Sequence, residues 1–280
     1  MRTIDAAKIT EVVAGLCEEA NFILEPSVHS AMQKALMEEV SPLGKDVFAQ
    51  ILANAALAAE NRLPICQDTG IVLVLVELGQ DVHVTGGGLY AAIDQGVRQA
   101  YQRGYLRKSV VNDPIERTNT KDNTPAVIHC RIVDGERIRI SLMPKSAGSE
   151  NMSTALMLNP ADGWEGIKSF VLDTVDQAGS NPCPPVIVGV GIGGTLEKAA
   201  LLAKEALFRP VGQRNRAEIL AHLEEELLDA VNRLGIGPMG RGGRITALAV
   251  HIEVFPTHMS SLPVAVNLLC CAARYKTMEI

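Results

Sequence analysis

Three cysteines stand in connecting segments where their thiols could do chemistry. Cys66 opens the run Cys-Gln-Asp-Thr-Gly just before the apolar stretch 71–76, and Cys183 is enclosed by prolines in Asn-Pro-Cys-Pro-Pro. Cys270 and its neighbour Cys271 end the last apolar segment of the chain. A thiolate can act as a nucleophile or bind a metal ion, whereas a buried thiol packs as a small hydrophobic group. The prolines fix the backbone around Cys183 more rigidly than burial requires, which favours a functional thiol there.

The cysteine spacing argues against the commonest cysteine-rich sites. The chain has no Cys-x-x-Cys pair, so a structural zinc site is not predicted. Six cysteines in 280 residues, behind an N-terminus that does not resemble a secretory signal, do not predict a disulfide framework either. Cys17 and Cys130 fall on the apolar faces of an expected helix and an expected strand, where we expect them to pack in the core.

Asp68, Thr69 and Gly70 spell the Asp-Thr-Gly motif of aspartic proteases. That chemistry needs two carboxylates that share a proton, and this chain carries one such motif. Proteases of that class are all-β, whereas the apolar periodicity of this chain is heavily helical. An aspartic protease is therefore not the predicted function.

A glycine-rich motif from Gly189 to Gly194 satisfies Gly-x-Gly-x-x-Gly between an expected strand and an expected helix. Such a segment can hold a pyrophosphate at the helix N-terminus. Here the helix leads into another helix instead of a strand that ends in an acidic residue, and no Walker lysine follows. Tight packing of a strand-to-helix turn explains the glycines at least as well. A nucleotide-binding or regulatory module remains the alternative function.

The elements that must position these residues follow from the apolar periodicity. Residues of about 1–62 show helical spacing and predict a helical N-terminal lobe. The run 71–78 is expected to be a buried strand, and 126–142 an antiparallel hairpin turned by an Asp-Gly pair. The pattern also predicts helices over about 86–104, 164–178, 196–208 and 215–234 and strands over 186–190, 245–254 and 263–269. The predicted fold is α+β, with the helical lobe packed on a mixed or antiparallel sheet in a single domain, 1–280.

Composition narrows the classes of partner. The chain is 47% hydrophobic, 21% charged and 4% aromatic, with a net charge of -6 and no long Lys/Arg block, so it predicts neither a nucleic-acid surface nor a membrane surface. Its longest apolar runs are far shorter than the roughly 20 residues that cross a bilayer. The polar stretch 105–124 is long for a loop, which is typical of a functional segment. We therefore expect a cytoplasmic chain whose partner is a small molecule or a protein.

Seven segments, in order along nearly the whole chain, resemble one enzyme family. The segments are 64–70 (PICQDTG), 106–111 (LRKSVV), 117–129, 148–153 (GSENMS), 181–185 (NPCPP), 189–195 (GVGIGGT) and 256–274. The family that they resemble is class I (iron–sulfur) fumarate hydratase and L-tartrate dehydratase, in its α subunit or N-terminal domain. Seven motifs in register are far more specific than any one of them.

The resemblance implies a cluster and its ligands. Cys66, Cys183 and Cys270 fall on the three cysteines that ligate a [4Fe-4S] cluster in the family. Three thiolates leave one iron open to act as a Lewis acid toward a hydroxyl and a carboxylate. Cys271 departs from the family pattern, and it is the alternative to Cys270 as the third ligand.

The resemblance also implies which residues meet the substrate. Gln67, Asp68, Arg107 and Gly148 are expected to bind it, with Arg107 clamping a carboxylate. Asp68 and His258 are expected to be catalytic, and Asp68 is either the base or the group that orients and deprotonates a hydroxyl base. The implied reaction is the reversible loss of water from a 2-hydroxy dicarboxylate, with fumarate and malate ranked before L-tartrate.

A separate subunit is implied as well. Single-chain members of the family continue into a further substrate-binding domain, whereas this sequence ends at Ile280, shortly after the last expected ligand. The chain therefore resembles the α member of a two-chain enzyme. We expect a β subunit that completes the active site, an α2β2 assembly, and little or no hydratase activity from the isolated chain.

Overall fold

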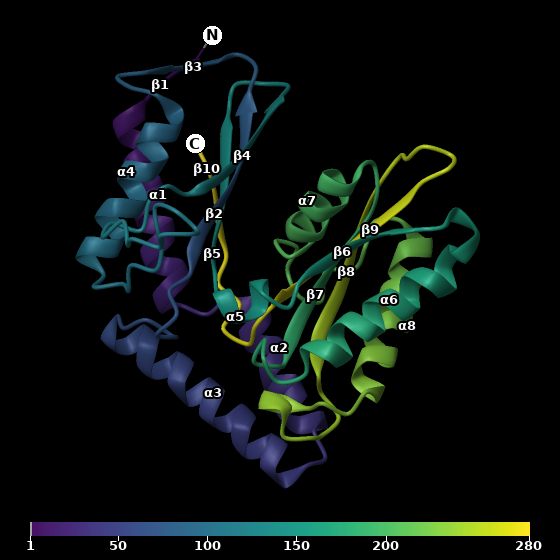
Figure 1. Ribbon diagram of the computed structural model, residues 1–280. Coiled ribbons are helices and arrows are strands. Elements are labelled where there is room, and N and C mark those ends of the chain that lie inside the picture. Colours follow the sequence, from purple (N-terminus) through teal and green to yellow (C-terminus); the bar gives the residue numbers. More distant parts are fainter. Residues whose placement is uncertain (1) are drawn as a thin grey trace. The chain divides into compact units, whose positions relative to one another are not determined.

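The computed structural model describes residues 2–280, which group into two compact units. Unit 1 is built from the stretch that ends at Glu25 together with Asn54–Ala147 and Arg274–Ile280, and unit 2 from Pro26–Ala53 and Gly148–Ala273. Each unit contains a four-stranded mixed sheet flanked by helices (Figure 1). The α+β class predicted from the sequence is confirmed, and the single-domain organisation stays a prediction.

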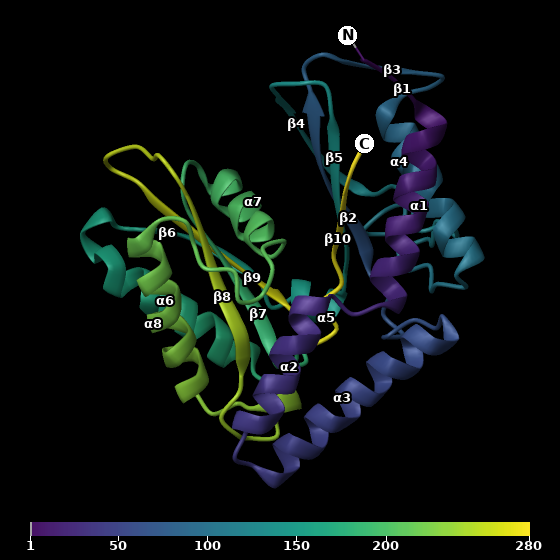
Figure 2. The same ribbon diagram turned by 180° about the vertical axis from the view of Figure 1, so that it is seen from behind.

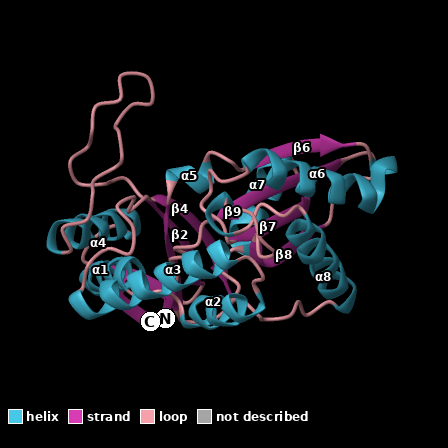
Figure 3. Ribbon diagram, turned by 90° about the horizontal axis from the view of Figure 1, so that it is seen from below, coloured by secondary structure: helices cyan, strands magenta, loops and turns pink. Residues whose placement is uncertain are grey.

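Unit 1 places helices α1 and α4 side by side on one face of its sheet, as Figures 1 and 2 both show. The strand order of the sheet is β10-β5-β2-β4, and a short parallel pair, β1 with β3, lies apart from it. The loop after α4, drawn in pink in Figure 3, contains one isolated β-bridge. The elements of unit 1 are β1 (Arg2–Asp5), α1 (Ala6–Phe22), β2 (Ile71–Gly79), β3 (Val82–Thr85), α4 (Leu89–Arg103), β4 (Val127–Val133), β5 (Ile138–Lys145) and β10 (Lys276–Glu279).

The hairpin predicted for 126–142 is wrong, although its turn is present. Gly135 adopts a φ of 104°, as the Asp-Gly pair predicts, but β4 and β5 do not pair with each other. Strand β2 lies between them, parallel to β4 and antiparallel to β5. β2 is buried along most of its length and fills the centre of the sheet, whereas β4 is largely exposed and suits the edge. The turn residues predict a reversal of the chain and not the strand that pairs there.

Unit 2 places α7 on one face of its sheet and α6 with α8 on the other (Figure 1). The strand order is β6-β9-β7-β8, in which β7 is antiparallel to β9 and parallel to β8. The elements are α2 (Pro26–Glu38), β6 (Thr154–Leu158), α6 (Gly163–Ala178), β7 (Val186–Gly193), α7 (Leu196–Ala206), α8 (Glu218–Arg233), β8 (Ala247–Phe255), β9 (Leu262–Leu269) and two 3-10 turns, η1 (Pro160–Asp162) and η2 (Pro238–Gly240).

Two helices cross the boundary between the stretches that form the units. α3 (Pro42–Asn61) begins in unit 2 and ends in unit 1, and the one-turn helix α5 (Ala147–Glu150) also has residues in both. The helical spacing predicted for about 1–62 is therefore present, as α1, α2 and α3, but these helices contribute to both units. Among residues 2–280, no helix combines the length and the apolarity that a membrane span requires.

The glycine-rich motif lies inside strand β7 instead of in a loop. A Cβ atom at Gly189 would stand 2.1 Å from the carbonyl oxygen of Ala203, and one at Gly191 would stand 2.0 Å from that of Ala199. Both carbonyls belong to α7, so the glycines let this helix lie directly against the strand. Close packing, rather than a phosphate-binding loop, accounts for these two glycines.

Candidate active site

Cys66 lies in the connection from α3 to β2, and hydrogen bonds fix the backbone just before it. The Ile65 amide donates to the carbonyl oxygen of Asn21 at 2.9 Å, and the Asn54 side chain donates to the carbonyl oxygen of Ile65 at 2.9 Å. The thiol itself is half-buried. Cys66 is therefore held at the surface of unit 1 instead of being packed in its core.

Thr69 joins the Cys66 segment to the polar loop that carries Arg107. Thr69 is buried, and its hydroxyl donates a hydrogen bond of 2.6 Å to the carbonyl oxygen of Arg107. The buried hydroxyl of Tyr101 in turn donates to the carbonyl oxygen of Thr69. Gln67 and Arg107 are exposed, and neither side chain is paired with another described residue. Two of the expected substrate contacts are thus brought together with Cys66, and both side chains remain open to solvent.

Asn123 is a second tie between these segments. Its side chain is fully buried, accepts a hydrogen bond from the Ser109 amide at 2.7 Å and donates one to the carbonyl oxygen of Gly70 at 3.1 Å. Asn123 adopts a φ of 63°, a conformation that asparagine tolerates better than most residues. Asn123 therefore holds the polar loop in two places: it binds the backbone of Ser109, two residues after Arg107, and it binds the backbone of Gly70 beside the Cys66 segment.

Asp68 uses both of its carboxylate oxygens to bind the backbone. One oxygen accepts a hydrogen bond from the Gly70 amide at 3.0 Å, and the other accepts one from the Ala147 amide at 2.9 Å. The carboxylate therefore connects the Cys66 segment to the chain directly before Gly148. These two hydrogen bonds suit a residue that holds the neighbouring backbone segments in position.

Cys183 and Cys270 are brought together at one end of the sheet in unit 2. Cys183 precedes β7, Cys270 follows β9, and the antiparallel register of these strands pairs Ile187 with Leu269. The Cys271 amide donates a hydrogen bond of 3.1 Å to the carbonyl oxygen of Cys183. This end of the sheet thus gathers two of the expected ligands with the alternative, Cys271.

The backbone of Cys183 is in a costly conformation. Its φ is 55°, in the left-handed region that residues other than glycine rarely occupy, and its side chain is exposed. A Cβ atom at Gly148 would stand 3.2 Å from the carbonyl oxygen of Asn181, so the Gly148 segment lies beside the Cys183 loop. Strained backbone concentrates at functional positions, where the surrounding structure holds it.

His258 lies at the opposite end of β7 from Cys183. Its loop is attached to that end by the Thr257 hydroxyl, which donates to the carbonyl oxygen of Gly194 at 2.9 Å. β7 has 8 residues, so its ends are roughly 25 Å apart. Within unit 2 the structure therefore does not bring His258 to the cysteines. The Ser260 amide donates to His258 Nδ1 at 3.1 Å, which leaves the proton of the neutral ring on Nε2.

The remaining cysteines separate into one buried and one exposed thiol. Cys17 is fully buried, as predicted, and burial raises its pKa far above the usual range. Cys130 is exposed, so its predicted burial is wrong: it lies on β4, an edge strand with much of its length open to solvent. None of the six cysteines, all within the described residues, forms a disulfide.

A match to a family model covers almost the whole chain. Residues 10–279 match the model described as "Fumarate hydratase (Fumerase)". The chain belongs to the fumarate hydratase family. It is therefore an enzyme chain of the hydro-lyase class, and the resemblance drawn from the seven sequence segments is confirmed.

Relatives of this fumarate hydratase family member carry a more specific name. A chain of Methanocaldococcus jannaschii, provisionally named as an L(+)-tartrate dehydratase α subunit, is 43% identical over 273 residues, which cover 95% of both chains. L(+)-tartrate dehydratase subunit alpha of Escherichia coli and that of Shigella boydii are each 33% identical over 277 residues, 98% of this chain and 91% of the relative. All three matches extend over nearly the full length of this chain and of each relative.

The thiols and the buried arginine of this family member are the kinds of group that an anionic metal cluster requires. Thiolates are the usual protein ligands of iron–sulfur clusters, and Cys183 offers its thiol at the surface next to Cys270. Within unit 1, Cys66 has a half-buried thiol, and Arg274 is a buried cation, two of whose nitrogen atoms have no acceptor among residues 2–280. Within the same described residues, no three His, Cys, Asp or Glu side chains are arranged as a metal-binding group.

Sequence reasoning missed the residues that support the site. Asn21, Tyr101, Thr69 and Asn123 act through hydrogen bonds between distant segments, and their types and spacing give no local signal. Arg274 does have a local signal in the sequence: it directly follows an uncharged stretch, 263–273, that is mostly apolar.

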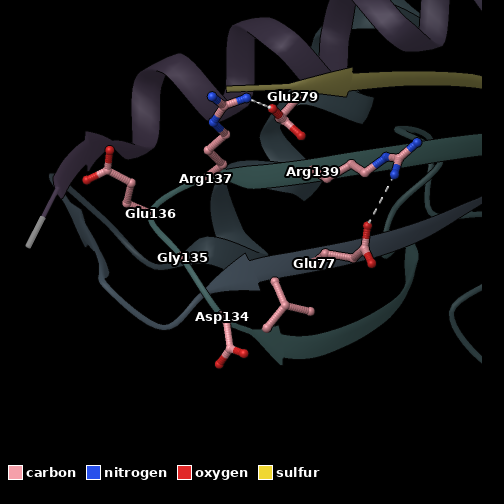
Figure 4. A pocket seen from close by; sticks show the side chains of 8 residues that line it. Glu77, Asp134, Gly135, Glu136, Arg137, Arg139 and Glu279 are labelled. Atoms are coloured by element: carbon pink, nitrogen blue, oxygen red, sulfur yellow. Dashed lines mark hydrogen bonds and ion pairs between the residues drawn. The ribbon is translucent and has the colours of Figure 1, made fainter.

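A surface pocket elsewhere in unit 1 has a different character. It measures about 400 Å³ and is lined mainly by charged side chains at the edge of the sheet (Figure 4). Arg137 pairs with Glu279, and Arg139 pairs with Glu77 at 3.8 Å, as the dashed lines in Figure 4 mark. These pairs occupy both arginines that line the pocket, and its other charged lining residues are the carboxylates of Asp134 and Glu136, so the described residues of the lining offer no free cation for an anionic substrate.

Proposed function

We propose that this chain is the iron–sulfur α subunit of a hydro-lyase that removes water from a 2-hydroxy dicarboxylate. One observation carries the proposal: the hydrogen bond from the Cys271 amide to the Cys183 carbonyl holds two of the three expected cluster ligands at one end of a sheet. Family membership supports the reaction class. The third expected ligand, Cys66, has a fixed backbone and a partly exposed thiol in unit 1.

Cys66, Cys183 and Cys270 would hold a [4Fe-4S] cluster. When bound, a cluster with three protein ligands supplies one open iron that polarises the hydroxyl and a carboxylate of the substrate. The Cys183 φ of 55° supports this assignment, because a strained thiol-bearing residue is retained where its position matters.

Arg107, Gln67 and Gly148 would bind the substrate. A guanidinium grips a carboxylate through two parallel N–H groups, and the unpaired side chain of Arg107 is available for that contact. The Thr69 hydroxyl sets the position of Arg107 through its carbonyl oxygen. Gln67 adds an amide, and Gly148 adds a backbone N–H group that no side chain shields.

Asp68 would act through geometry more than as a free base. Both of its oxygens accept backbone hydrogen bonds, so it fixes the Cys66 segment against the backbone of Ala147. Each oxygen retains a second lone pair that can accept a proton or orient a hydroxyl group that does.

His258 would donate a proton from Nε2, the ring nitrogen that carries it in the neutral form. Because it lies at the far end of β7 from Cys183, it cannot reach a substrate bound at the cysteines of its own chain. Our assignment of His258 as catalytic therefore requires that it serve the site of a neighbouring chain.

Two dicarboxylates are the substrates to test. L(+)-tartrate comes first because the relatives at 33–43% identity are named for it. Malate and fumarate come second because the family model is described as fumarate hydratase. L(+)-tartrate and malate differ by one hydroxyl group at the carbon that loses its proton, and a polar pocket can discriminate strongly between such substrates.

The enzyme would also need a second kind of chain. The relatives that match this chain over nearly their full length are named as alpha subunits, which supports a separate β subunit. We propose an α2β2 assembly in the cytoplasm, with the β subunit supplying further substrate contacts.

An anaerobic assay of the reconstituted enzyme tests this function. The chain is loaded with iron and sulfide, alone and with its candidate β chain, and assayed with L(+)-tartrate, D(-)-tartrate and malate. We expect turnover only with both chains present. Full turnover by the isolated, loaded chain would refute the two-subunit proposal, and no turnover of any of the three acids by the pair would refute the reaction.

A further inference from the structure

Arg274 is a buried positive charge with incomplete hydrogen bonding. It is 1% exposed, and it is the largest of the fully buried side chains. Its Nη1 donates to the side-chain oxygen of Asn21 at 3.2 Å, whereas Nε and Nη2 have no acceptor among residues 2–280. A guanidinium keeps its charge at every ordinary pH, so it cannot relieve this by losing a proton. A buried, unpaired charge strongly destabilises a folded chain unless something compensates it.

Asn21 links Arg274 to the Cys66 segment. Asn21 accepts the hydrogen bond from Arg274 on its side chain and accepts the one from the Ile65 amide on its backbone. Tyr101 marks the other end of the segment, because its hydroxyl donates to the Thr69 carbonyl oxygen. Arg274 is thus tied, through Asn21, to the backbone that leads into Cys66.

The protein groups around Arg274 do not supply the missing negative charge. No carboxylate among residues 2–280 forms an ion pair with it. Cys17 lies close to Tyr101 and Asn21, but burial raises the pKa of its thiol and keeps it neutral. Two residues between Ile65 and Thr69 can carry a negative charge, Cys66 and Asp68. Both oxygens of Asp68 accept hydrogen bonds from backbone amides, those of Gly70 and Ala147, which leaves Cys66 as the site of the compensating charge.

We propose that Arg274 is a positioning residue for the anionic group held at Cys66, with its Nε and Nη2 directed at that charge. The inference rests on the proposed function, in which Cys66 ligates an iron–sulfur cluster. Hydrogen bonds and nearby charge are known to tune both the retention and the reduction potential of such clusters. Arg274 would therefore stabilise the loaded chain and destabilise the empty one.

The test compares the full chain with and without its cluster in three variants. Arg274→Met removes the charge but keeps the length, and Arg274→Lys keeps the charge. Arg209→Met is the matched control, because the Arg209 side chain is only 11% exposed but is paired with Glu224 at 2.6 and 3.0 Å. Three quantities are measured under anaerobic conditions: the urea midpoint of the empty chain, the rate of iron loss to a chelator and the reduction midpoint of the cluster.

Arg274→Met should leave the urea midpoint of the empty chain unchanged or higher, because an unpaired buried charge is gone. It should speed iron loss about tenfold or more, as expected from losing a hydrogen bond to a charged group. The cluster should become harder to reduce, so its midpoint should shift to a more negative potential. Arg274→Lys should bring both the rate of iron loss and the reduction midpoint part of the way back to the wild-type values. Arg209→Met should lower the urea midpoint of the empty chain and leave the reduction midpoint unchanged.

Two results would overturn the inference while leaving the proposed function intact. One is a loaded Arg274→Met chain whose iron loss and reduction midpoint equal those of the wild type. The other is an empty Arg274→Met chain that unfolds as easily as Arg209→Met, or fails to fold, which would make Arg274 an ordinary structural residue. A wild-type chain that takes up no cluster would instead overturn the proposed function, and this inference with it.

Discussion

The hydroxyl of Thr69 holds the backbone of Arg107, through a hydrogen bond of 2.6 Å to its carbonyl oxygen. Thr69 lies three residues after Cys66, so one contact links a candidate cluster ligand to the candidate carboxylate clamp. The loop that carries Arg107 is otherwise exposed over much of its length. Its position is therefore set by a few buried polar contacts instead of by packing.

Replacing Thr69 by Val should weaken substrate binding more than turnover. Valine has nearly the same shape, but it removes the donor and leaves the Arg107 carbonyl without its partner, at a cost of about 1–3 kcal/mol. We expect the KM of the assembled enzyme to rise about tenfold or more, with kcat less affected, in steady-state assays under anaerobic conditions. Thr69→Ser keeps the hydroxyl and should stay close to wild type. Equal KM values for the valine and serine variants would show that this contact does not position Arg107.

Glu39 is a buried carboxylate whose loss should destabilise unit 2. It is 1% exposed, and burial alone would raise its pKa, yet backbone hydrogen bonds outweigh burial and lower that pKa. The donors are the N–H groups of Val40, Ser41, Arg244 and Ile245. In Glu39→Gln an amide group faces donors, so we expect the free energy of unfolding to fall by about 3 kcal/mol in urea titrations.

The preceding residue, Glu38, which is the last of α2, provides the control for Glu39. Glu38 has a half-exposed side chain and reaches Lys34 at 3.6 Å. Surface pairs of this kind contribute little, so Glu38→Gln should change the free energy of unfolding by less than about 1 kcal/mol. Similar losses in the two variants would contradict the special role of Glu39.

His251 should make the fold less stable as the pH falls below neutrality. It is 2% exposed; burial, together with the smaller effect of the Arg209 charge, lowers its pKa to about 4, and Glu224 opposes both. Because an unfolded histidine titrates near 6.5, the unfolded chain binds a proton between pH 6.5 and 4 that the folded chain does not. Its contribution is complete above pH 6.5 and is lost toward pH 4, by about 3 kcal/mol in total.

Urea titrations at pH 7.5 and pH 5 measure this effect. The wild type should lose stability between the two, and His251→Asn, which can still donate to the Ala206 carbonyl that His251 Nδ1 contacts at 3.1 Å, should lose markedly less. His222→Asn is the control, because His222 is exposed. If all three chains lose the same stability, another group must be responsible.

Two inactive α chains should complement each other if His258 serves a neighbouring site. His258 and Cys183 lie at opposite ends of β7, so one chain cannot bring them to the same substrate. Co-expression of Cys183→Ser and His258→Asn chains with the β subunit should yield mixed assemblies with one intact site. Their activity should approach about a quarter of the wild-type value, since about half of randomly formed pairs are mixed and each has one working site of two. No activity above that of either variant alone would remove His258 from the catalytic residues.

The parts of the fold that follow from local pattern were predictable. The buried strand from Ile71 and the helix that begins after Gly88 carry their own periodicity and caps. Which strands pair with each other in the sheet was not predictable in the same way. The turn at Gly135 was right but its hairpin was wrong, because β2, distant in sequence, is more apolar and takes the central place.

The candidate site shows the same division. Cys66, Cys183 and Arg107 stand in unusual local contexts that the sequence displays. Thr69 and Arg274 do not, because their roles depend on contacts with residues far along the chain. Burial of Cys130 was predicted from an apolar pattern, but an edge strand leaves such a residue exposed.

The most direct test of the account is the cluster content of cysteine variants. The full chain is reconstituted with iron and sulfide without oxygen, and bound iron is counted in the wild type and in five single Cys→Ser variants, at positions 66, 130, 183, 270 and 271. The account predicts about four irons in the wild type and in Cys130→Ser and Cys271→Ser, and loss of the cluster in Cys66→Ser, Cys183→Ser and Cys270→Ser. A wild type that binds no cluster, or a cluster that survives in Cys183→Ser and is lost in Cys130→Ser, would contradict it.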